Sequence, residues 1–385
     1  MRRLIAGLVI VLACSGVAAE EVPGKKDPSK VGTAAGAATK AKPAAKKKAV
    51  PKGPPARELF GATESPAPLE ARSIGSYSKG CLAGGVSLPI NGPDWQVMRL
   101  SRNRNWGNPR LLDYMERLAS DARALDGWSG LLVGDMSQPR GGPMVNGHTS
   151  HQVGLDADIW LTPMPDRILT PQEREDMSAV SMLKDPFTVD PAVWTPLHVK
   201  LIKRAASYRQ VERIFVHPAI KKKLCEETSK DRGWLGKVRP WWNHHYHFHI
   251  RLSCPPGAAG CDNQKPVLGD DGCGKELDNW YKMLRAAALA VSKPPSPNAK
   301  PWPGKKPLYM GDLPADCKTV LTAGGNVPVA DGSQVPAVLK AVASKEAGPP
   351  VPILTPEQIA AMKASKDNKS GSDPGVVPLP DRKPH

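Results

Sequence analysis

Two short histidine-rich segments hold the side chains of this sequence that are best suited to chemistry. One extends from His148 to Asp158 and the other from His244 to His249, and six of the nine histidines lie in them. Imidazole and carboxylate groups are common zinc ligands, and a site with three protein ligands keeps one coordination position open for catalysis. The pattern therefore predicts the zinc centre of a metal hydrolase.

The strands that must position these side chains can be read from the alternation of polar and apolar residues. Along an extended segment, successive side chains point to opposite faces. In the segment 155–161, Asp156 and Asp158 would share one face while apolar residues occupy the other. In the segment 245–252, alternate histidines would likewise share one face: His245, His247 and His249. Two such strands side by side would place His249 and Asp158 around one metal ion.

His151 precedes the first of these strands. Gly154 lies between them and permits the sharp turn that would bring the His151 imidazole back over the carboxylates of the strand. The spacing leaves open which aspartate binds and whether one or two strand histidines do. Independent surface or packed histidines are the alternative, and two clusters as dense as these argue against it.

The rest of the core alternates between helical and strand periodicity. Apolar residues at helical spacing predict helices over 108–125, 194–208 and 273–291. Thr170 followed by Pro171 has the form of a capped helix start. Further strands are expected at 130–133 and 213–216. Because helices and strands interleave without strict alternation, we expect an α+β fold in which helices flank a small antiparallel sheet.

The first 19 residues have the features of an export signal. Arginines at positions 2 and 3 precede an apolar run over 4–13, and small residues at 17–19 form a cleavage site. The apolar run is too short to span a membrane. The competing interpretation is a lipoprotein signal in which Cys14 is lipidated, although the bulky Leu12 fits that pattern poorly. Export argues against nucleic acid as a partner.

Low-complexity sequence flanks the expected core. Residues 20–60 are rich in Lys, Ala and Pro and lack apolar periodicity, so we expect a disordered basic tether. The tether supplies much of the net charge of +16, which would suit contact with anionic polymers of the cell envelope. A single folded domain is expected over 61–320. Residues 321–385 are expected to form a Pro-rich, largely disordered tail with a short helical patch at 355–365.

Six cysteines remain once the export signal is removed. They are Cys81, Cys225, Cys254, Cys261, Cys273 and Cys317. An even number of cysteines in an exported chain predicts disulfide bonds, here three, although spacing alone does not fix the pairing. Metal binding by these cysteines is disfavoured because the sequence contains no C-x-x-C pair.

The spacing of the histidine-rich segments resembles a known signature. His151 and Asp158, followed by His247-Phe248-His249, resemble the H-x(6)-D … H-x-H pattern of lysostaphin-type peptidases, D-Ala-D-Ala metallopeptidases and hedgehog signalling domains. Longer segments at 135–144, 147–161 and 237–241 are similar to the penicillin-insensitive murein endopeptidase family, and the match extends from about 76 to 317. The resemblance implies the core fold that these groups share.

The resemblance also implies roles for individual residues. Zinc would be held by His151, Asp158 and His249, which leaves Asp156 to support the ligands or the fold. His247 and His244 fall at positions of active-site imidazoles. The implied activity is a periplasmic zinc endopeptidase acting on peptidoglycan, which it would cut at cross-links between D-alanine and meso-diaminopimelate.

Members of this family also carry a second zinc ion at a subunit interface. His148 and Asp185 match two of its ligand positions, but the third position holds Thr188, whose hydroxyl is a poor zinc ligand. The sequence therefore supplies two of the three expected ligands for the second ion, and for the homodimer that would share it. The resemblance further implies three disulfide pairs: Cys81 with Cys317, Cys225 with Cys273, and Cys254 with Cys261.

Two other functions compete with a zinc hydrolase. A non-catalytic module could keep the metal for folding and bind the cell wall or a signalling partner, but the complete set of ligand and active-site histidines argues against it. A serine penicillin-binding enzyme is suggested by three short motifs beginning at Ser76, Ser101 and Lys369. Each of those motifs is common by chance.

Overall fold

The computed structural model describes residues 53–267, 269–291 and 306–324, and these residues belong to one compact unit. The expected export signal, most of the basic tether, residues 325–385 and the helical patch at 355–365 lie outside the described residues. The proposed domain boundaries therefore stay predictions. Among the described helices, none combines the length and the apolar character needed to cross a membrane.

A six-stranded sheet forms the centre of the fold. Its strands lie in the order β11 (Val238–Pro240), β10 (Val211–Val216), β12 (His247–Leu252), β7 (Asp156–Trp160), β6 (Leu131–Val133) and β4 (Trp95–Val97). Neighbours from β10 to β6 pair antiparallel, whereas the outermost pairs, β10 with β11 and β4 with β6, are parallel. The α+β class is confirmed, and the antiparallel arrangement holds for the centre of the sheet.

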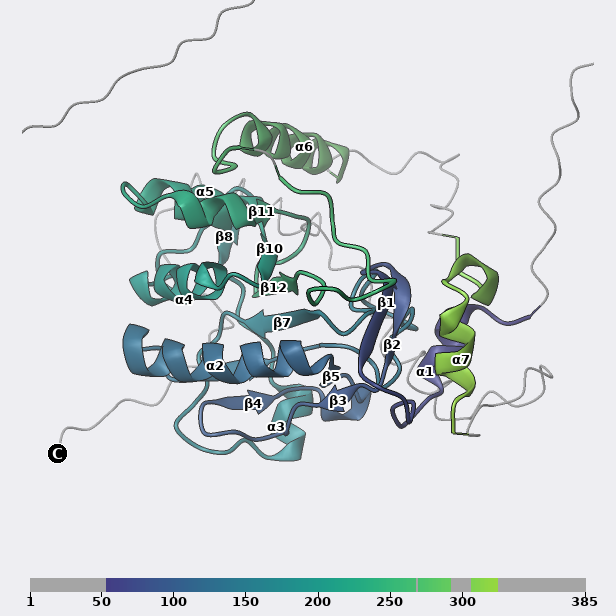
Figure 1. Ribbon diagram of the computed structural model, residues 1–385. Helices are drawn as coiled ribbons and strands as arrows, with labels where there is room; N and C mark the ends of the chain where they lie inside the picture. Colours follow the sequence, from purple (N-terminus) through teal and green to yellow (C-terminus); the bar gives the residue numbers. More distant parts are fainter. Residues whose placement is uncertain (1–52, 268, 292–305, 325–385) are drawn as a thin grey trace, which may run out of the picture. The chain divides into compact units, whose positions relative to one another are not determined.

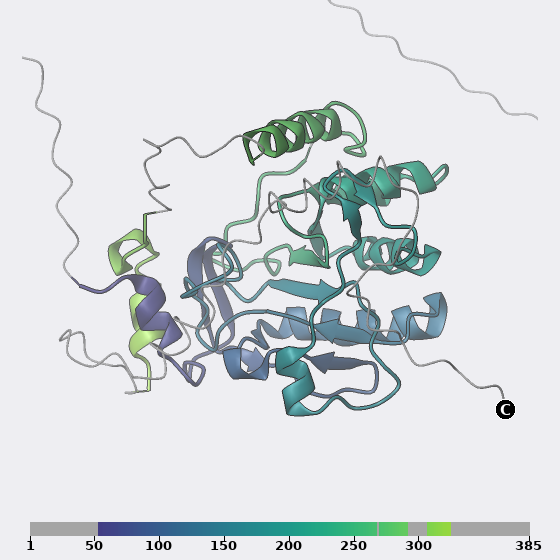
Figure 2. The same cartoon turned by 180° about the vertical axis from the view of Figure 1, so that it is seen from behind.

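Helices α2 (Pro109–Asp126) and α4 (Pro196–Ser207) lie together on one face of this sheet, as Figures 1 and 2 show. The side chain of Asn108 caps α2 by accepting from the backbone N–H of Arg110, and the helix ends at Gly127 in a left-handed conformation. Apolar residues of β7 and β12, such as Ile159 and Phe248, are fully buried in the same core as the inner faces of the two helices. The polar residues that alternate with them on β7 and β12 consequently face the other way.

The helices α5 (Pro218–Glu227) and α6 (Lys275–Val291) lie beside each other near the β11 edge. The remaining helices are α1 (Ala56–Gly61), α3 (Pro171–Asp176) and α7 (Asp316–Thr322), with short 3-10 turns at Leu100–Arg102, Gly233–Lys237 and Met310–Asp312. Three hairpins or strand pairs complete the fold: β1 (Arg72–Ser76) with β2 (Lys79–Ala83), β3 (Val86–Ser87) with β5 (Trp106–Gly107), and β8 (Leu183–Asp185) with β9 (Thr188–Val189).

The two ends of the described chain meet in a second, smaller core. Phe60 of α1 is fully buried there with Cys317 and Val320 of α7 and Cys81 of β2, and Figure 1 shows α1 and α7 side by side next to the β1–β2 hairpin. Helix α1 begins at Ala56, inside the segment that composition assigns to the tether. Its burial shows that this part of the segment packs against α7, the last helix that the structure describes.

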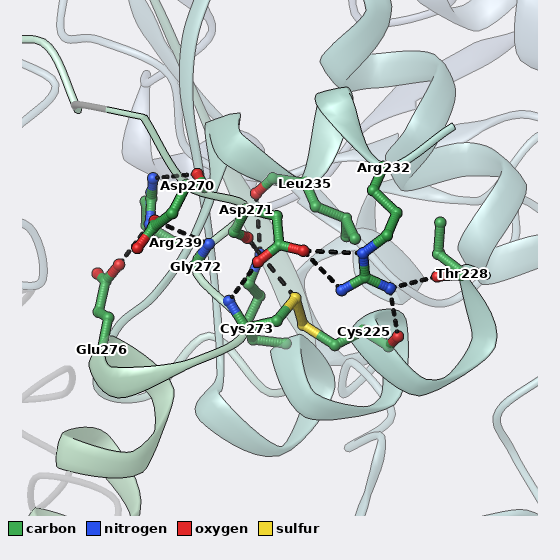
Figure 3. The surroundings of a disulfide bond; sticks show 11 residues. Cys225, Thr228, Arg232, Leu235, Arg239, Asp270, Asp271, Gly272, Cys273 and Glu276 are labelled. Carbon is green, nitrogen blue, oxygen red and sulfur yellow. Dashed lines mark hydrogen bonds and ion pairs between the residues drawn. A yellow bond between two sulfur atoms is a disulfide. The ribbon is translucent and has the colours of Figure 1, made fainter. Parts of the chain in front are cut away.

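Three disulfide bonds join the pairs that the family resemblance implies. Cys81 of β2 is bonded to Cys317 of α7 across 236 residues of sequence. Cys225 of α5 is bonded to Cys273, just before α6, and Figure 3 shows the polar contacts around this bond. Cys254 and Cys261 close a short loop after β12.

Candidate metal centre

The pairing of β7 with β12 brings two of the predicted ligands face to face. Asp158 and His249 are direct partners in the antiparallel register. Both side chains are buried on the face of the sheet away from α2, and His249 Nδ1 lies 3.1 Å from Asp158 Oδ1. The alternation along each strand therefore positions this pair as the sequence predicts.

His151 reaches the same point from the loop before β7. His151 itself has a φ of 67° and Gly154 a φ of 71°, both in the left-handed region. A Cβ at Gly154 would lie 2.8 Å from the backbone nitrogen of Asn108, so the turn needs a glycine there. The backbone N–H of His151 donates to Asp156 Oδ2 at 2.9 Å, and Ser137 Oγ donates to the His151 carbonyl at 2.7 Å. These bonds fix the imidazole over the strand.

The three donor atoms have the spacing that a metal ion requires. His151 Nε2 lies 3.1 Å from His249 Nδ1 and 3.5 Å from Asp158 Oδ1. Around a tetrahedral ion with ligand bonds of about 2.0–2.1 Å, ligand atoms are separated by roughly 3.3 Å. Asp158 Oδ1 is buried and has no hydrogen-bond partner among the described residues. A buried carboxylate oxygen of this kind is costly unless a cation satisfies it, so the residues fit a bound metal.

The electrostatic environment favours the ligand forms of His151 and Asp158. For His249, burial would lower the pKa, but the carboxylates of Asp156 and Asp158 raise it. Burial lowers the pKa of His151, which keeps its imidazole neutral. Burial alone would raise the pKa of Asp158, but the imidazoles of His247, His151 and His148 lower it well below its ordinary value, so the carboxylate is ionised. Metal binding needs a neutral imidazole and an ionised carboxylate.

The Asp156 carboxylate orients His249 by contacting the ring nitrogen that points away from Asp158. His249 Nε2 lies 3.1 Å from Asp156 Oδ1, so its other nitrogen, Nδ1, points at Asp158 and His151. Arg251 Nε donates to the same Asp156 oxygen at 2.8 Å. Opposing effects act on the carboxyl: burial would raise its pKa, but Arg251 and His249 hold it well below the ordinary value. A carboxylate behind a ligating imidazole is a common device for fixing its orientation.

His148 joins the cluster through an aspartate that the sequence analysis did not select. Its Nε2 lies 3.0 Å from Asp135 Oδ2 and 3.5 Å from Asp158 Oδ2. Donor atoms of His148, His151 and Asp158 all lie within 4.8 Å of one another, so this group too could hold an ion. Asp135 is buried and also accepts hydrogen bonds from Arg102 at 3.1 Å and Arg104 at 2.9 Å.

Asp185 lies away from this cluster, at the end of β8. Its carboxylate accepts from the backbone N–H of Phe187 at 2.8 Å and from the Thr188 hydroxyl at 2.5 Å. The expected second zinc site would join residues across a subunit interface, which one chain does not test, so it stays a prediction. Within the chain, the hydroxyl of Thr188, which stands at the third ligand position, donates to the Asp185 carboxylate.

The two candidate catalytic histidines stand beside the ligands. His247 is buried at the start of β12, and its Nε2 lies 3.6 Å from Asp158 Oδ2. Burial lowers the pKa of His247 to about 4. His244 precedes the strand with a φ of 42°, and its ring lies 4.9 Å from that of His247. Its Nδ1 donates to the Trp242 carbonyl at 2.6 Å, so the neutral ring keeps a lone pair on Nε2.

His245 does not share the face of the other two strand histidines. The strand begins at His247 rather than at His245, so alternation does not extend that far. The His245 imidazole instead lies 2.9 Å from the Ser181 hydroxyl. The prediction that three histidines share one face is therefore wrong for His245. The turn through His244 precedes the strand, so His245 is not part of it.

A cleft of about 260 Å³ opens onto the cluster. Its lining residues include Asp158, His148 and His247, together with Arg99, Arg102 and Trp160. Arg99 lies over the Trp160 ring, 5.4 Å from its centroid, and donates to the backbone carbonyls of Arg174 and Met177, each at 2.9 Å. The cleft thus brings the predicted ligand Asp158 together with the positive charge of Arg99 and Arg102.

The serine motifs have ordinary structural surroundings where they are described. Ser101 Oγ donates to Glu175 at 2.9 Å. Ser76 ends β1 and lines a different pocket, together with Tyr77 and Arg251. Lys369 lies outside the described residues.

Comparison with known proteins agrees with the geometry. A family model described as penicillin-insensitive murein endopeptidase matches residues 73–322. Three proteins with that name are similar to this chain. The Haemophilus influenzae protein is 46% identical over 227 residues, covering 58% of this chain and 78% of the relative. The protein of Klebsiella pneumoniae subsp. pneumoniae is 40% identical over 251 residues (65% and 86%), and that of Escherichia coli O1:K1 is 41% identical over 236 (61% and 86%).

Proposed function

The chain belongs to the penicillin-insensitive murein endopeptidase family, and from this we propose that it is a periplasmic zinc endopeptidase that cleaves peptidoglycan cross-links between D-alanine and meso-diaminopimelate. The observation that carries the zinc assignment is the set of three buried donor atoms from His151, Asp158 and His249, spaced 3.1–3.5 Å apart. The names of the relatives support murein as the substrate class.

His249 suits the third ligand position better than His148 does. His148 Nε2 lies at hydrogen-bond distance from Asp135, and a ring nitrogen that donates its proton to a carboxylate has no lone pair for a metal. In His249 the nitrogen facing the carboxylate of Asp156 is Nε2, which leaves Nδ1 for the ion. We therefore assign His148 a supporting role beside Asp158.

Two histidines beside the ligands, His247 and His244, would supply the proton transfers of peptide hydrolysis. Zinc bound by these residues would polarise the scissile carbonyl and lower the pKa of a water molecule. His247 lines the cleft as a neutral base and would accept the proton of the attacking water. His244 adjoins His247. Its Nε2 carries a lone pair, so it would first take up the proton released by the attacking water, and the ring would then donate to the developing oxyanion or pass that proton to the leaving amine.

The decisive experiment combines metal content with activity. His151→Ala and His249→Ala should each lose stoichiometric zinc and abolish the release of monomeric muropeptides from cross-linked sacculi. A chelator should do the same to the wild type, and added zinc should restore activity. His245→Ala is a matched control in the same segment, because its imidazole faces Ser181, and it should keep both zinc and activity.

His148→Ala tests whether His249 or His148 is the third ligand beside His151 and Asp158. With His249 as third ligand, this variant should retain zinc. Loss of zinc in His148→Ala together with its retention in His249→Ala would overturn the assignment. A zinc-loaded wild type that binds sacculi without cleaving them would instead support the non-catalytic module.

A further inference from the structure

A group of three tryptophans, of which Trp241 is the most exposed, lies next to the metal centre, and its indole rings have no role in the hydrolysis just described. We propose that Trp241, Trp242 and Trp280, here called the tryptophan platform, bind the glycan strand that carries the peptide being cut. This inference rests on the proposed function, because it names a second part of the same polymeric substrate.

The three indole rings form one continuous aromatic surface. The Trp280 ring centroid lies 5.8 Å from that of Trp241 and 5.3 Å from that of Trp242. Trp280 is buried, whereas Trp241 is 51% exposed and Trp242 is partly exposed. Trp241 therefore rests against the buried Trp280 and presents a preformed, half-exposed aromatic face to a ligand.

The platform is rigidly held by the elements beneath it. The backbone N–H of Trp241 donates to the Val216 carbonyl at 2.8 Å, which fixes the chain where it leaves β11. Helix α6, which carries Trp280, is tied at its start by the Cys225–Cys273 disulfide and by the ion pair of Glu276 with Arg239 (Figure 3). A surface fixed in this way loses little conformational entropy when it binds a ligand.

The platform is continuous with the metal centre. Phe215 bridges the two, because its ring centroid lies 5.7 Å from that of Trp241 and 5.4 Å from that of His249. The carbonyl of Trp242 also accepts the hydrogen bond that orients His244. An extended peptide advances about 3.3–3.6 Å per residue. A stem peptide of roughly three or four residues therefore covers the distance from His249 through Phe215 to Trp241. A peptide bond at the metal would thus bring its own sugar to the platform.

The chemistry of the surface fits a sugar ring. A pyranose presents a face of C–H groups with slight positive charge, and the π face of an indole carries slight negative charge. The hydroxyl and acetamido groups at the ring edge need polar partners, and Asn243 is exposed directly beside Trp242. An N-acetylhexosamine strand meets both requirements.

The binding test uses the full mature protein and the tetramer of N-acetylglucosamine, which contains no peptide bond. Titration should quench or shift tryptophan fluorescence in the wild type, and calorimetry should give a dissociation constant. Trp241→Ala should weaken binding about 10-fold, and Trp241→Phe should retain most of it. Leu125→Ala, which truncates an exposed side chain at the far end of α2, should leave affinity unchanged. Absence of binding, or equal binding by Trp241→Ala, would overturn the proposal whether or not the protein cleaves murein.

A kinetic test addresses the polymer itself. Cross-linked muropeptide dimers with sugars are compared with the same peptides after the sugars have been removed by an amidase. In Trp241→Ala the ratio of kcat/KM for the two substrates should fall about 10-fold through a higher KM for the sugar-bearing one. An equal loss of kcat/KM on both substrates would show that Trp241 contacts the peptide, and would reject the glycan assignment. Association with neutral phosphatidylcholine vesicles that is tighter than with the sugar in the wild type, and is lost in Trp241→Ala, would identify the platform as a membrane contact and reject the glycan assignment.

Discussion

At the scale of single residues, the candidate centre depends on carboxylates that do not touch the metal position. Asp156 fixes His249, and Asp135 fixes His148 beside Asp158. In each carboxylate, the oxygen that contacts the histidine also accepts from arginine: from Arg251 in Asp156, and from Arg102 and Arg104 in Asp135. Each arginine offsets a buried negative charge, so the carboxylates can be ionised without competing for the metal.

The role assigned to Asp156 gives a quantitative prediction. Asp156→Asn keeps the size of the side chain but removes the charge that holds the His249 Nε2 proton, so the imidazole loses basicity and a fixed orientation. We expect metal affinity to fall about 10–100-fold, measured by competition with a chromophoric chelator. Asp316→Asn, at an exposed ion pair with Arg72, is the control and should not change affinity. Unaltered affinity in Asp156→Asn would remove this carboxylate from the ligand-orienting network.

The sequence could predict the ligands because they lie within two short segments whose spacing encodes their geometry. His151 and Asp158 need only a turn and a strand, and His249 needs only the partner strand. Asp135 and Arg104 could not be predicted in the same way. They come from loops before β7 and after β4, and only the folded chain brings them to His148. A sequence of this kind identifies residues that act within one element better than residues that meet across several.

At the scale of elements, those with local signals could be predicted, including the long helices and the short α3 with its Thr170 capping box. The expected helix over 108–125 corresponds to α2 (Pro109–Asp126), because an apolar stripe and a capped start with proline are both local signals. Helix α5 was not anticipated. Its inner face includes Lys221, so a buried cation interrupts the apolar stripe by which such a helix is recognised.

Lys221 also makes stability depend on pH. Its Nζ donates to the carbonyls of Leu235 and Asp271 at 2.9 and 2.6 Å. Burial, with a further contribution from Arg239, lowers the pKa of Lys221 to about 7 from the ordinary 10.5. Between these values the unfolded chain binds more protons than the folded chain, so the contribution of Lys221 to the free energy of unfolding increases with pH and diminishes as pH falls toward 7.

Replacing the lysine should remove this contribution. Lys221→Met is expected to be less stable than the wild type at pH 9, because two carbonyls lose their donor, and the difference should shrink at pH 7. Urea denaturation of both proteins at the two pH values measures this difference in the free energy of unfolding. A stability difference that is the same at pH 7 and pH 9 would show that Lys221 does not titrate in this range.

At the scale of the whole molecule, the longest disulfide joins segments that lie 236 residues apart in the sequence. Cys81–Cys317 ties the β1–β2 hairpin to α7, within a small core separate from the one under the main sheet. Arg140, which is almost fully buried, adds hydrogen bonds to the carbonyls of Val320 and Leu321 at the end of α7. The number of cysteines could predict three bonds, but only the family resemblance could predict their pairing, because distance along the chain carries no information about which cysteines meet.

The three bonds should therefore differ in their effect on stability. Closing a loop restricts the unfolded chain more as the loop lengthens, and the chain-entropy relation gives about 5 kcal/mol for a separation of 236 residues and about 2 kcal/mol for a separation of 7. The double variant Cys81→Ala/Cys317→Ala should lose about 2–3 kcal/mol more unfolding free energy in urea than Cys254→Ala/Cys261→Ala does. The metal content of both variants should match the wild type at low denaturant, because neither bond contacts the metal ligands. Equal losses would mean that the small core stays assembled in the unfolded chain, and that α1 and α7 hold the ends together without the bond.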